Sequence, residues 1–263
     1  MPTHLYCLLN VAAAEDASAD AHGIVGIGGS SVRQLRSGQG PDAIEAWVST
    51  VSGDERRAGG AADTAALALA HNAVVDAALA TGRTPLPARF GQRFPDDAAC
   101  MADVVERAPS LRALLERVAG CVEMRVLVAA NRSSAIRAAP HAELAPYAGA
   151  PNAGRRYLES VRARILHDEH ATAEAVAVLD RVSALVRPFV REEAKRTQAQ
   201  DLWSLSHLVR RESVHTYRSV VSAMPVAEHL RLIVSGPHGP YSFVAGFDMS
   251  RIGHDSSSLI IGD

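Results

Sequence analysis

The chain has 263 residues, of which 48% are hydrophobic and 5% aromatic, and its formal net charge at pH 7 is −2. This length suits one large domain or two small ones. The charge gives no basic field for nucleic-acid phosphates or for a membrane surface, and no run of 18 apolar residues predicts a membrane span. We therefore expect a protein that binds neither nucleic acid nor membrane.

The three cysteines, Cys7, Cys100 and Cys121, are widely spaced and form no CxxC pair. This spacing argues against zinc ribbons and thioredoxin-type sites. Each thiol stands among apolar residues, which predicts buried cysteines in a reducing cytoplasm. The first residues lack the basic segment of a secretory signal, so no export is expected.

In the first half of the chain, short apolar runs and alternating patterns predict strands around a long helix. Strands are expected at residues 5–11, 30–38, 44–53, 85–94 and 121–130. Helices are expected between residues 63 and 82, and between 96 and 120 with a break at Pro109. This order predicts an α+β sandwich of ferredoxin-like type over residues 1–130.

The second half begins with residues 131–154, a connection rich in proline, alanine and glycine that predicts a domain boundary. Apolar residues at helical spacing then predict a helical region from 155 to about 195, ended or kinked at Pro188. A second α+β domain is expected over 155–248. Its remaining elements are a strand at 201–209, a helix at 211–224 and a strand at 228–236. The polar residues 249–263 are expected to form a flexible tail.

Two patterns raise the question of ligand chemistry. The loop GIGGSS at residues 26–31 lacks the last glycine of a GxGxxG motif and opens no predicted helix, which favours a plain turn. His167 and His170 share a helical face but have no third ligand at a telling spacing. The other histidines are scattered, without a nucleophile elbow. The residues predict no catalytic group, cofactor or metal. A small enzyme or ligand-binding protein that uses the histidines or the 26–31 loop is the alternative.

The segment GPHGPYSFV, residues 236–244, predicts a rigid turn after a strand. Its glycines permit turn geometry, whereas its prolines fix φ and remove two hydrogen-bond donors. The two aromatic residues are spaced by two, so an extended segment would place both rings on one side. We therefore expect a structural anchor made of Gly236, Pro237, Pro240, Tyr241 and Phe243.

GPHGPYSFV resembles the closing signature of the gas vesicle GvpF/GvpL family, which commonly reads GPWPPYSFV. Further segments that resemble the family follow in order along the chain: LYCLLN, HNAVVDAAL, PLPARFGQRF, CVEMRVLV and GRRYLESV. The resemblance extends from about residue 5 to 247. The LPLRFG-type segment assigns Pro87, Arg89, Phe90 and Gly91 to a family-motif strand.

The chain departs from the family pattern at three positions. His238 and Gly239 stand where Trp and Pro are usual, and Ala88 stands where Leu is usual. The missing aromatic implies looser packing of the signature. Because the family places another residue at position 238, we expect no catalytic role for His238.

The resemblance implies a non-enzymatic accessory protein of gas vesicle formation with two α+β domains. Its implied partners are the small hydrophobic shell protein and sibling accessory proteins, at the gas vesicle in the cytoplasm. A shell subunit exposes apolar surface before it assembles. A sheet edge or an apolar face of the first domain is expected to hold that surface. A minor structural shell component without chaperone action is the other role left open.

Overall fold

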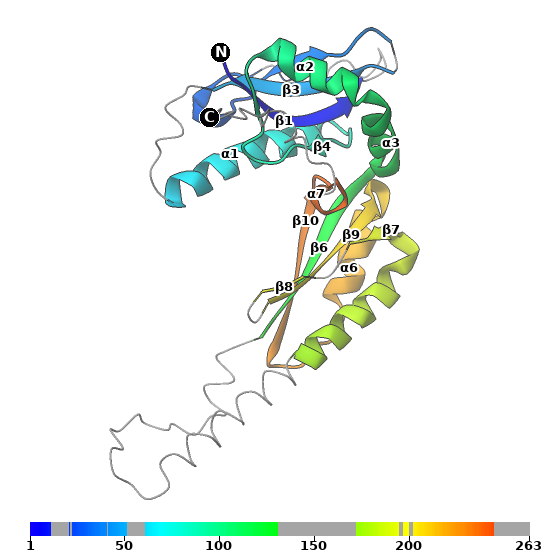
Figure 1. The fold of residues 1–263 in the computed structure, drawn as a ribbon. Coiled ribbons are helices and arrows are strands. Elements are labelled where there is room, and N and C mark those ends of the chain that lie inside the picture. Colours follow the sequence, from blue (N-terminus) through cyan, green and yellow to red (C-terminus); the bar gives the residue numbers. More distant parts are fainter. Residues whose placement is uncertain are drawn as a thin grey trace, which may run out of the picture. The chain divides into compact units, whose positions relative to one another are not determined.

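The computed structural model describes residues 1–11, 21, 23–40, 42–51, 61–130, 172–194, 197–199 and 202–244. The chain divides into two compact units (Figure 1). The first comprises Met1–Val122 and His238–Asp263, and the second comprises Glu123–Pro237. The described end of the chain therefore returns to the first unit.

The first unit contains an antiparallel sheet with the strand order β2-β3-β1-β4, in which β5 also pairs with β1. The strands are β1 (Thr3–Asn10), β2 (Arg33–Arg36), β3 (Ile44–Thr50), β4 (Leu86–Pro87) and β5 (Arg93–Phe94). Every residue of β1 from Thr3 to Leu9 is buried. A strand buried on both faces needs cover on both sides.

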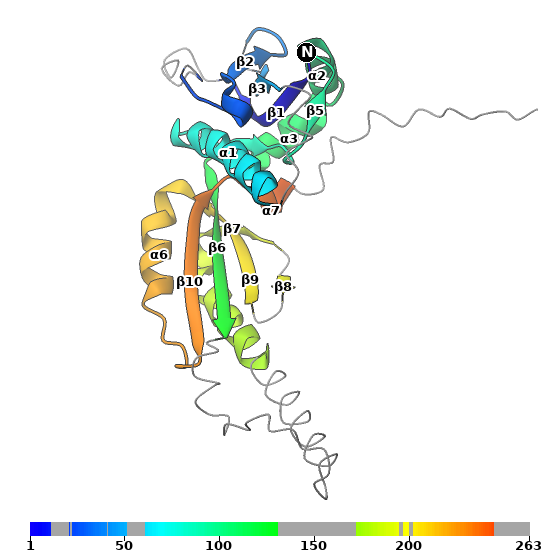
Figure 2. The same ribbon diagram turned by 90° about the vertical axis from the view of Figure 1, so that its left-hand side faces the viewer.

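Helices supply that cover in the first unit. They are α1 (Ala61–Ala80), α2 (Asp97–Glu106), α3 (Ala108–Val118) and the single turn α7 (Tyr241–Val244), with a 3-10 turn η2 (Ile27–Gly29). Helix α1 packs against one face of the sheet, and α2 and α3 pack against the other (Figures 1 and 2). The predicted break near Pro109 is confirmed, because α2 ends at Glu106 and Pro109 opens α3.

The second unit contains the strand order β10-β6-β9-β7, with β8 paired to β9. Its elements are β6 (Cys121–Ala130), helical residues 172–186, η4 (Arg187–Phe189), β7 (Val190–Glu193), β8 (Thr197–Ala199), β9 (Leu202–Arg210), η5 (Arg211–Ser213), α6 (Val214–Ser222) and β10 (Leu230–His238). Residues 172–186 and α6 cover one face of this sheet (Figures 1 and 2).

This arrangement corrects two expectations. Strand β6 was expected in the first sheet, but it pairs in the second, and the unit boundary falls after Val122. With β6 included, the described elements of the second unit follow the order β-α-β-β-β-α-β, and the first unit lacks the last strand of the arrangement expected for residues 1–130. An alternating pattern defines which face of a strand is apolar, but it does not identify the sheet that the strand joins.

The helical region also ends earlier than expected. Helical residues stop at 186, Pro188 lies in η4, and β7 begins at Val190. Proline in a helix interior removes a backbone hydrogen bond, so Pro188 marks the end of the helix as predicted. The short strands β7 and β8 were missed, because their polar residues carry no strong alternation. The predicted linker 131–154, the pair His167 and His170, and the tail 249–263 lie outside the described residues.

The prediction of buried cysteines is confirmed. Cys7, Cys100 and Cys121 are all buried free thiols. Burial, followed by the charge of Asp103, raises the pKa of Cys100 to about 12. All three pack as small apolar side chains, and burial raises the pKa of the Cys7 and Cys100 thiols so that neither carries a reactive thiolate at neutral pH.

Candidate functional site

Two of the segments that resemble the family, around β4 and around α7, meet in the first unit. Helix α7 packs on β4, and both of its last residues, Phe243 and Val244, are buried. A Cβ atom built on Gly239 would lie 2.9 Å from Cγ1 of Val75 and 3.7 Å from Cγ of Pro87. Glycine at position 239 therefore lets the chain pass close to α1 and β4 before α7 begins.

A cavity of about 20 Å³ lies beside this contact. Its lining side chains are all apolar and come from β1, β4, α3, α7 and the segment after β4; they include Leu5, Leu8, Ala88, Leu114 and Val244. Ala88 is the position at which the family pattern carries the larger leucine. The cavity has no polar side chain with which to orient a ligand and is small, so it is a packing gap rather than a binding site.

The geometry of the anchor differs from the expected one. Residues 241–244 are helical rather than extended, with the N–H of Phe243 donating to the carbonyl of Pro240 at 3.1 Å. Tyr241 and Phe243 therefore do not line one side of a strand. Strand β10 also continues to His238 instead of leaving the sheet at Gly236. Proline is accepted there because β10 lies at the end of the strand order.

The other family-motif residues have separate positions. Phe90 packs edge-on against the rings of His4 and His71, with centroids 6.4 Å and 5.9 Å away. Gly91 has φ +89°, which a turn between β4 and β5 requires. Arg89 is exposed. The motif residues thus have separate structural roles, as a ring, a turn and a packing surface. They do not come together in one chemical site.

A buried histidine pair joins α1 to the sheet. Nε2 of His4 lies 2.9 Å from Nδ1 of His71, and Nε2 of His71 lies 3.1 Å from the carbonyl of Ala88. A carbonyl only accepts, so His71 Nε2 donates to Ala88 and His71 Nδ1 accepts from His4. Nδ1 of His4 is buried without a hydrogen-bond partner. His71 therefore packs helix α1 against the sheet.

Both imidazoles are neutral at pH 7. Burial, then the neighbouring His71 and Arg93, lower the pKa of His4 to about 3. Burial lowers the pKa of His71 to about 4, against the opposing hydrogen bond to Ala88. The ordinary value is 6.5, so both groups bind protons less readily in the fold than in the unfolded chain.

This pair predicts an acid-sensitive first unit. Because unfolding takes up protons between about pH 6.5 and pH 4, the free energy of unfolding falls as pH falls through this window. The loss reaches about 1.4 kcal/mol per pH unit for each histidine. We expect His71→Gln to flatten this slope in urea unfolding at successive pH values. His215→Gln, at an exposed position on α6, is the control. An unchanged slope in His71→Gln would contradict the assignment.

The glycine loop is a packed turn. The N–H of Ile27 donates to the hydroxyl of Tyr6 at 2.8 Å, and a Cβ atom on Gly26 would lie 2.0 Å from that hydroxyl. The N–H groups of Gly26, Gly29 and Ser30 donate to carbonyls within the loop. A phosphate cradle needs free N–H groups aimed at the ligand, and here they are used internally. The alternative of a ligand at residues 26–31 therefore gains no support.

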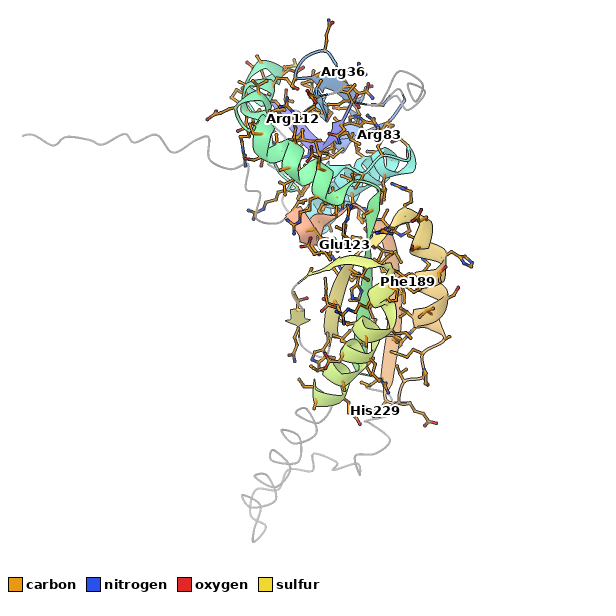
Figure 3. The ribbon with its side chains drawn as sticks, turned by 90° about the vertical axis from the view of Figure 1, so that its right-hand side faces the viewer. Arg36, Arg83, Arg112, Glu123, Phe189 and His229 are labelled. Atoms are coloured by element: carbon orange, nitrogen blue, oxygen red, sulfur yellow. The ribbon has the colours of Figure 1, made fainter. Side chains whose placement is uncertain are left out.

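Two buried carboxylates were not anticipated by the sequence. Glu45 on β3 accepts from Nε1 of Trp47 at 2.8 Å and pairs with Arg83 at 2.9 Å and Arg36 at 3.4 Å. Figure 3 labels both arginines. In the second unit, Glu123 on β6 accepts from the hydroxyl of Ser206 at 2.8 Å (Figure 3). Each carboxylate has charged and neutral donors, so both are satisfied structural groups.

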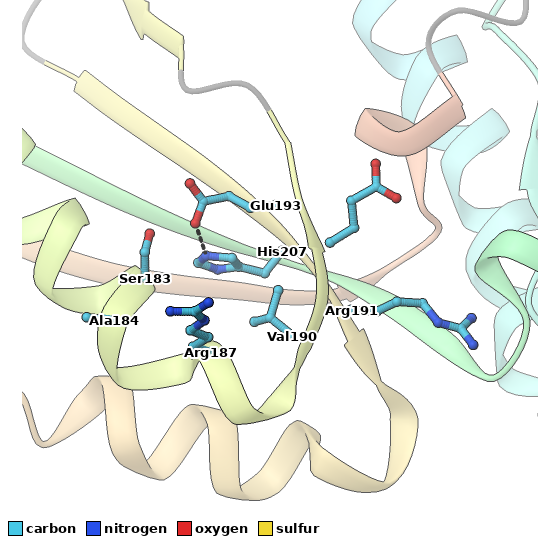
Figure 4. Close-up of a pocket in the computed structure, with 8 residues that line it drawn as sticks. Ser183, Ala184, Arg187, Val190, Arg191, Glu193 and His207 are labelled. Atoms are coloured by element: carbon cyan, nitrogen blue, oxygen red, sulfur yellow. Dashed lines mark hydrogen bonds and ion pairs between the residues drawn. The ribbon is translucent and has the colours of Figure 1, made fainter.

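The second unit contains an open cavity of about 400 Å³ beside His207 (Figure 4). His207 is fully buried; its Nδ1 lies 2.7 Å from the hydroxyl of Tyr217 and its Nε2 lies 3.3 Å from Glu193. Ser183 also lines the cavity. Because both ring nitrogens are engaged by Tyr217 and Glu193, His207 has no free lone pair with which to activate Ser183. Sequence reasoning missed this group, since its members are separated by strands and turns.

Other site types gain no support from the described part of the chain. Within residues whose placement is described, no three His, Cys, Asp or Glu side chains gather as metal ligands. No described helix is both long and apolar enough to cross a membrane.

Comparisons with known proteins agree on one family. The profile described as gas vesicle synthesis protein GvpL/GvpF matches residues 2–245. The fold is similar to the crystal structure of the gas vesicle protein GvpF from Anabaena sp. PCC7120, with a TM-score of 0.64 and 16% identity; the match covers 97% of this chain and 99% of that one.

The crystal structure of gas vesicle protein GvpF from Microcystis aeruginosa is also similar, with a TM-score of 0.61, 13% identity, and coverage of 92% of this chain and 98% of that one. No curated protein sequence matches this chain. At these identities the two crystal structures support the fold, whereas the profile match covers nearly every residue and supports the family. The chain belongs to the gas vesicle synthesis protein GvpL/GvpF family.

Proposed function

We propose that this protein is a non-enzymatic gas vesicle assembly protein that binds the small hydrophobic shell protein and sibling accessory proteins in the cytoplasm. The family match supports a role in the gas vesicle system. The buried histidine pair, the filled glycine loop and the fully engaged His207 fit a binding protein better than an enzyme.

The outer face of α1 is the observation that carries the proposal. This 20-residue helix has only two charged residues, Asp63 and Asp76, and no lysine or arginine. Leu69 is 72% exposed. The exposed positions Ala65, Ala66, Ala73 and Ala80 share its side, because they recur at spacings of three, four and seven, and the exposed Asp76 is the one charged residue on that side. An outer face that is apolar around a single carboxylate marks an interaction surface.

The sheet of the first unit is a less suitable surface for binding a shell subunit. Helices pack on both of its faces, and the edge strand β2 carries Arg33 and Arg36. Arg33 is held in an ion pair with Asp97 of α2. Charged edge strands resist strand addition. Apolar docking on α1 is therefore the favoured mode for holding a shell subunit before it assembles.

Leu69→Glu tests this mode. We expect at least a tenfold loss of shell protein that co-purifies with the tagged full chain after co-expression, because a carboxylate placed in an apolar contact must lose its hydration. The matched control is Val105→Glu on α2, where valine is 54% exposed. Thermal unfolding should show both variants folded.

Equal retention of shell protein by both variants would contradict docking on α1. A fragment ending at residue 130 is unsuitable for this test, because it lacks α7 and leaves β6 without its sheet. If the folded wild-type chain retains no shell protein but is found in purified vesicles, the role of a minor structural component is favoured instead.

A further inference from the structure

The cavity beside His207 has the size and the polar groups of a small ligand site. Its volume of about 400 Å³ falls within the range of small-molecule sites. The wall combines the last helical turns before η4 with β7 and β9 (Figure 4). Ala184 and Val190 supply apolar surface, and Ser183 supplies a hydroxyl.

One wall of the cavity holds a carboxylate in a fixed position. Glu193 is 37% exposed, and one of its oxygens lies 3.3 Å from Nε2 of the fully buried His207. The hydroxyl of Tyr217 donates to Nδ1 of His207 when Nε2–H donates to Glu193. Burial raises the pKa of Tyr217, which keeps this hydroxyl protonated. The Tyr217–His207 pair thus orients a carboxylate that still faces the cavity.

A guanidinium faces the same cavity. Figure 4 shows Arg187 extending beneath the ring of His207, whereas Arg191 extends away from it. Among the described residues, the guanidinium of Arg187 makes no hydrogen bond and no ion pair. A cavity with a fixed carboxylate and an available guanidinium suits a ligand with one anionic group and one N–H donor.

We propose that this cavity binds an α-carboxylate together with its neighbouring α-nitrogen. The carboxylate pairs with Arg187, whose planar group matches it in a bidentate manner. The α-nitrogen donates to Glu193, and Ser183 lies within the same wall. A free amino acid and the C-terminal residue of a peptide share this chemistry. The site is independent of the α1 surface.

Binding of four probes to the full chain tests the proposal: L-alanine, N-acetyl-L-alanine, N-acetyl-L-alanine amide and propionate. Isothermal titration and amide chemical shifts are the measurements. We expect binding of L-alanine, of N-acetyl-L-alanine or of both, and none of the amide. We also expect propionate, which lacks the nitrogen, to bind at least tenfold more weakly. Binding of the free amino acid alone identifies an amino-acid site, and binding of the acetylated form identifies a peptide C-terminus.

Matched variants locate the site. Arg187→Gln should weaken binding at least tenfold, because it removes the charge that pairs with the carboxylate. Glu193→Gln should weaken L-alanine more than propionate. The control Arg218→Gln, at an exposed position on α6, should bind as the wild type does. The proposal is overturned if neither carboxylate probe binds at 10 mM, or if Arg187→Gln binds them unchanged.

Discussion

Gly236→Ala is expected to destabilise the second unit by about 3 kcal/mol or more. Gly236 has φ +121°, a conformation that residues with a side chain rarely adopt. A Cβ atom there would lie 2.7 Å from the carbonyl oxygen of Glu123 and 2.9 Å from the sulfur of Met124. In this variant, backbone strain and a clash with β6 therefore both lower the free energy of unfolding. Urea unfolding followed by circular dichroism measures the loss.

Gly120→Ala separates these two causes. Gly120 also has a positive φ, +68°, but a Cβ atom there would meet nothing within 4 Å. We expect this control to cost only about 1 kcal/mol, from backbone strain alone. Equal losses in the two variants would show that the close approach of β10 to β6 contributes nothing, which would contradict the packing described for Gly236.

The local elements were largely predictable because their signals are local. Alternating Val122, Met124, Val126 and Val128 predict a strand wherever it pairs. Asp96 caps α2 by accepting from the N–H of Ala99 at 2.8 Å, and proline marks both the start of α3 and the end of the helical residues at 186. These signals act within a few residues, so the sequence alone contains them.

Pairings over long sequence separations were not predictable. The sheet that β6 joins depends on β9 and β10, which follow it by more than 70 residues. The contact between His4 and His71 spans 67 residues, and Glu193 meets His207 only because β7 and β9 are paired. In the sequence, the residues of the candidate sites are only isolated histidines and acidic residues. Which of them come together depends on the tertiary structure. A single sequence has no local pattern that reports contacts between residues far apart in the chain.

The resemblance to the family identified the anchor segment but not its conformation. The spacing of Tyr241 and Phe243 is compatible with a strand or a turn, and the two prolines favour neither after position 240. In the structure the carbonyl groups of Gly239 and Pro240 accept from the N–H groups of Tyr241 and Phe243, which closes a helical turn. That turn packs on β4, its residues Phe243 and Val244 are buried, and Val244 lines the apolar cavity.

Phe243→Ala is expected to destabilise the first unit by about 3 kcal/mol, because a truncated buried phenylalanine leaves a cavity. Phe243 is only 5% exposed, in a helix that packs on β4. A loss of this size is a large share of the stability of a small unit. We therefore expect a lower melting temperature and impaired vesicle formation in cells, caused by loss of folded protein.

His238→Ala is the matched control within the same segment. His238 is half-buried at the end of β10, and its charge acts on Asp76 of α1, where burial outweighs it and raises the pKa of that carboxyl. We expect less than about 1 kcal/mol of change and normal vesicles, as for other substitutions at partly exposed positions. If His238→Ala abolished vesicles in a fully folded protein while Phe243→Ala left them intact, the segment would have a chemical role, and the anchor interpretation would be wrong.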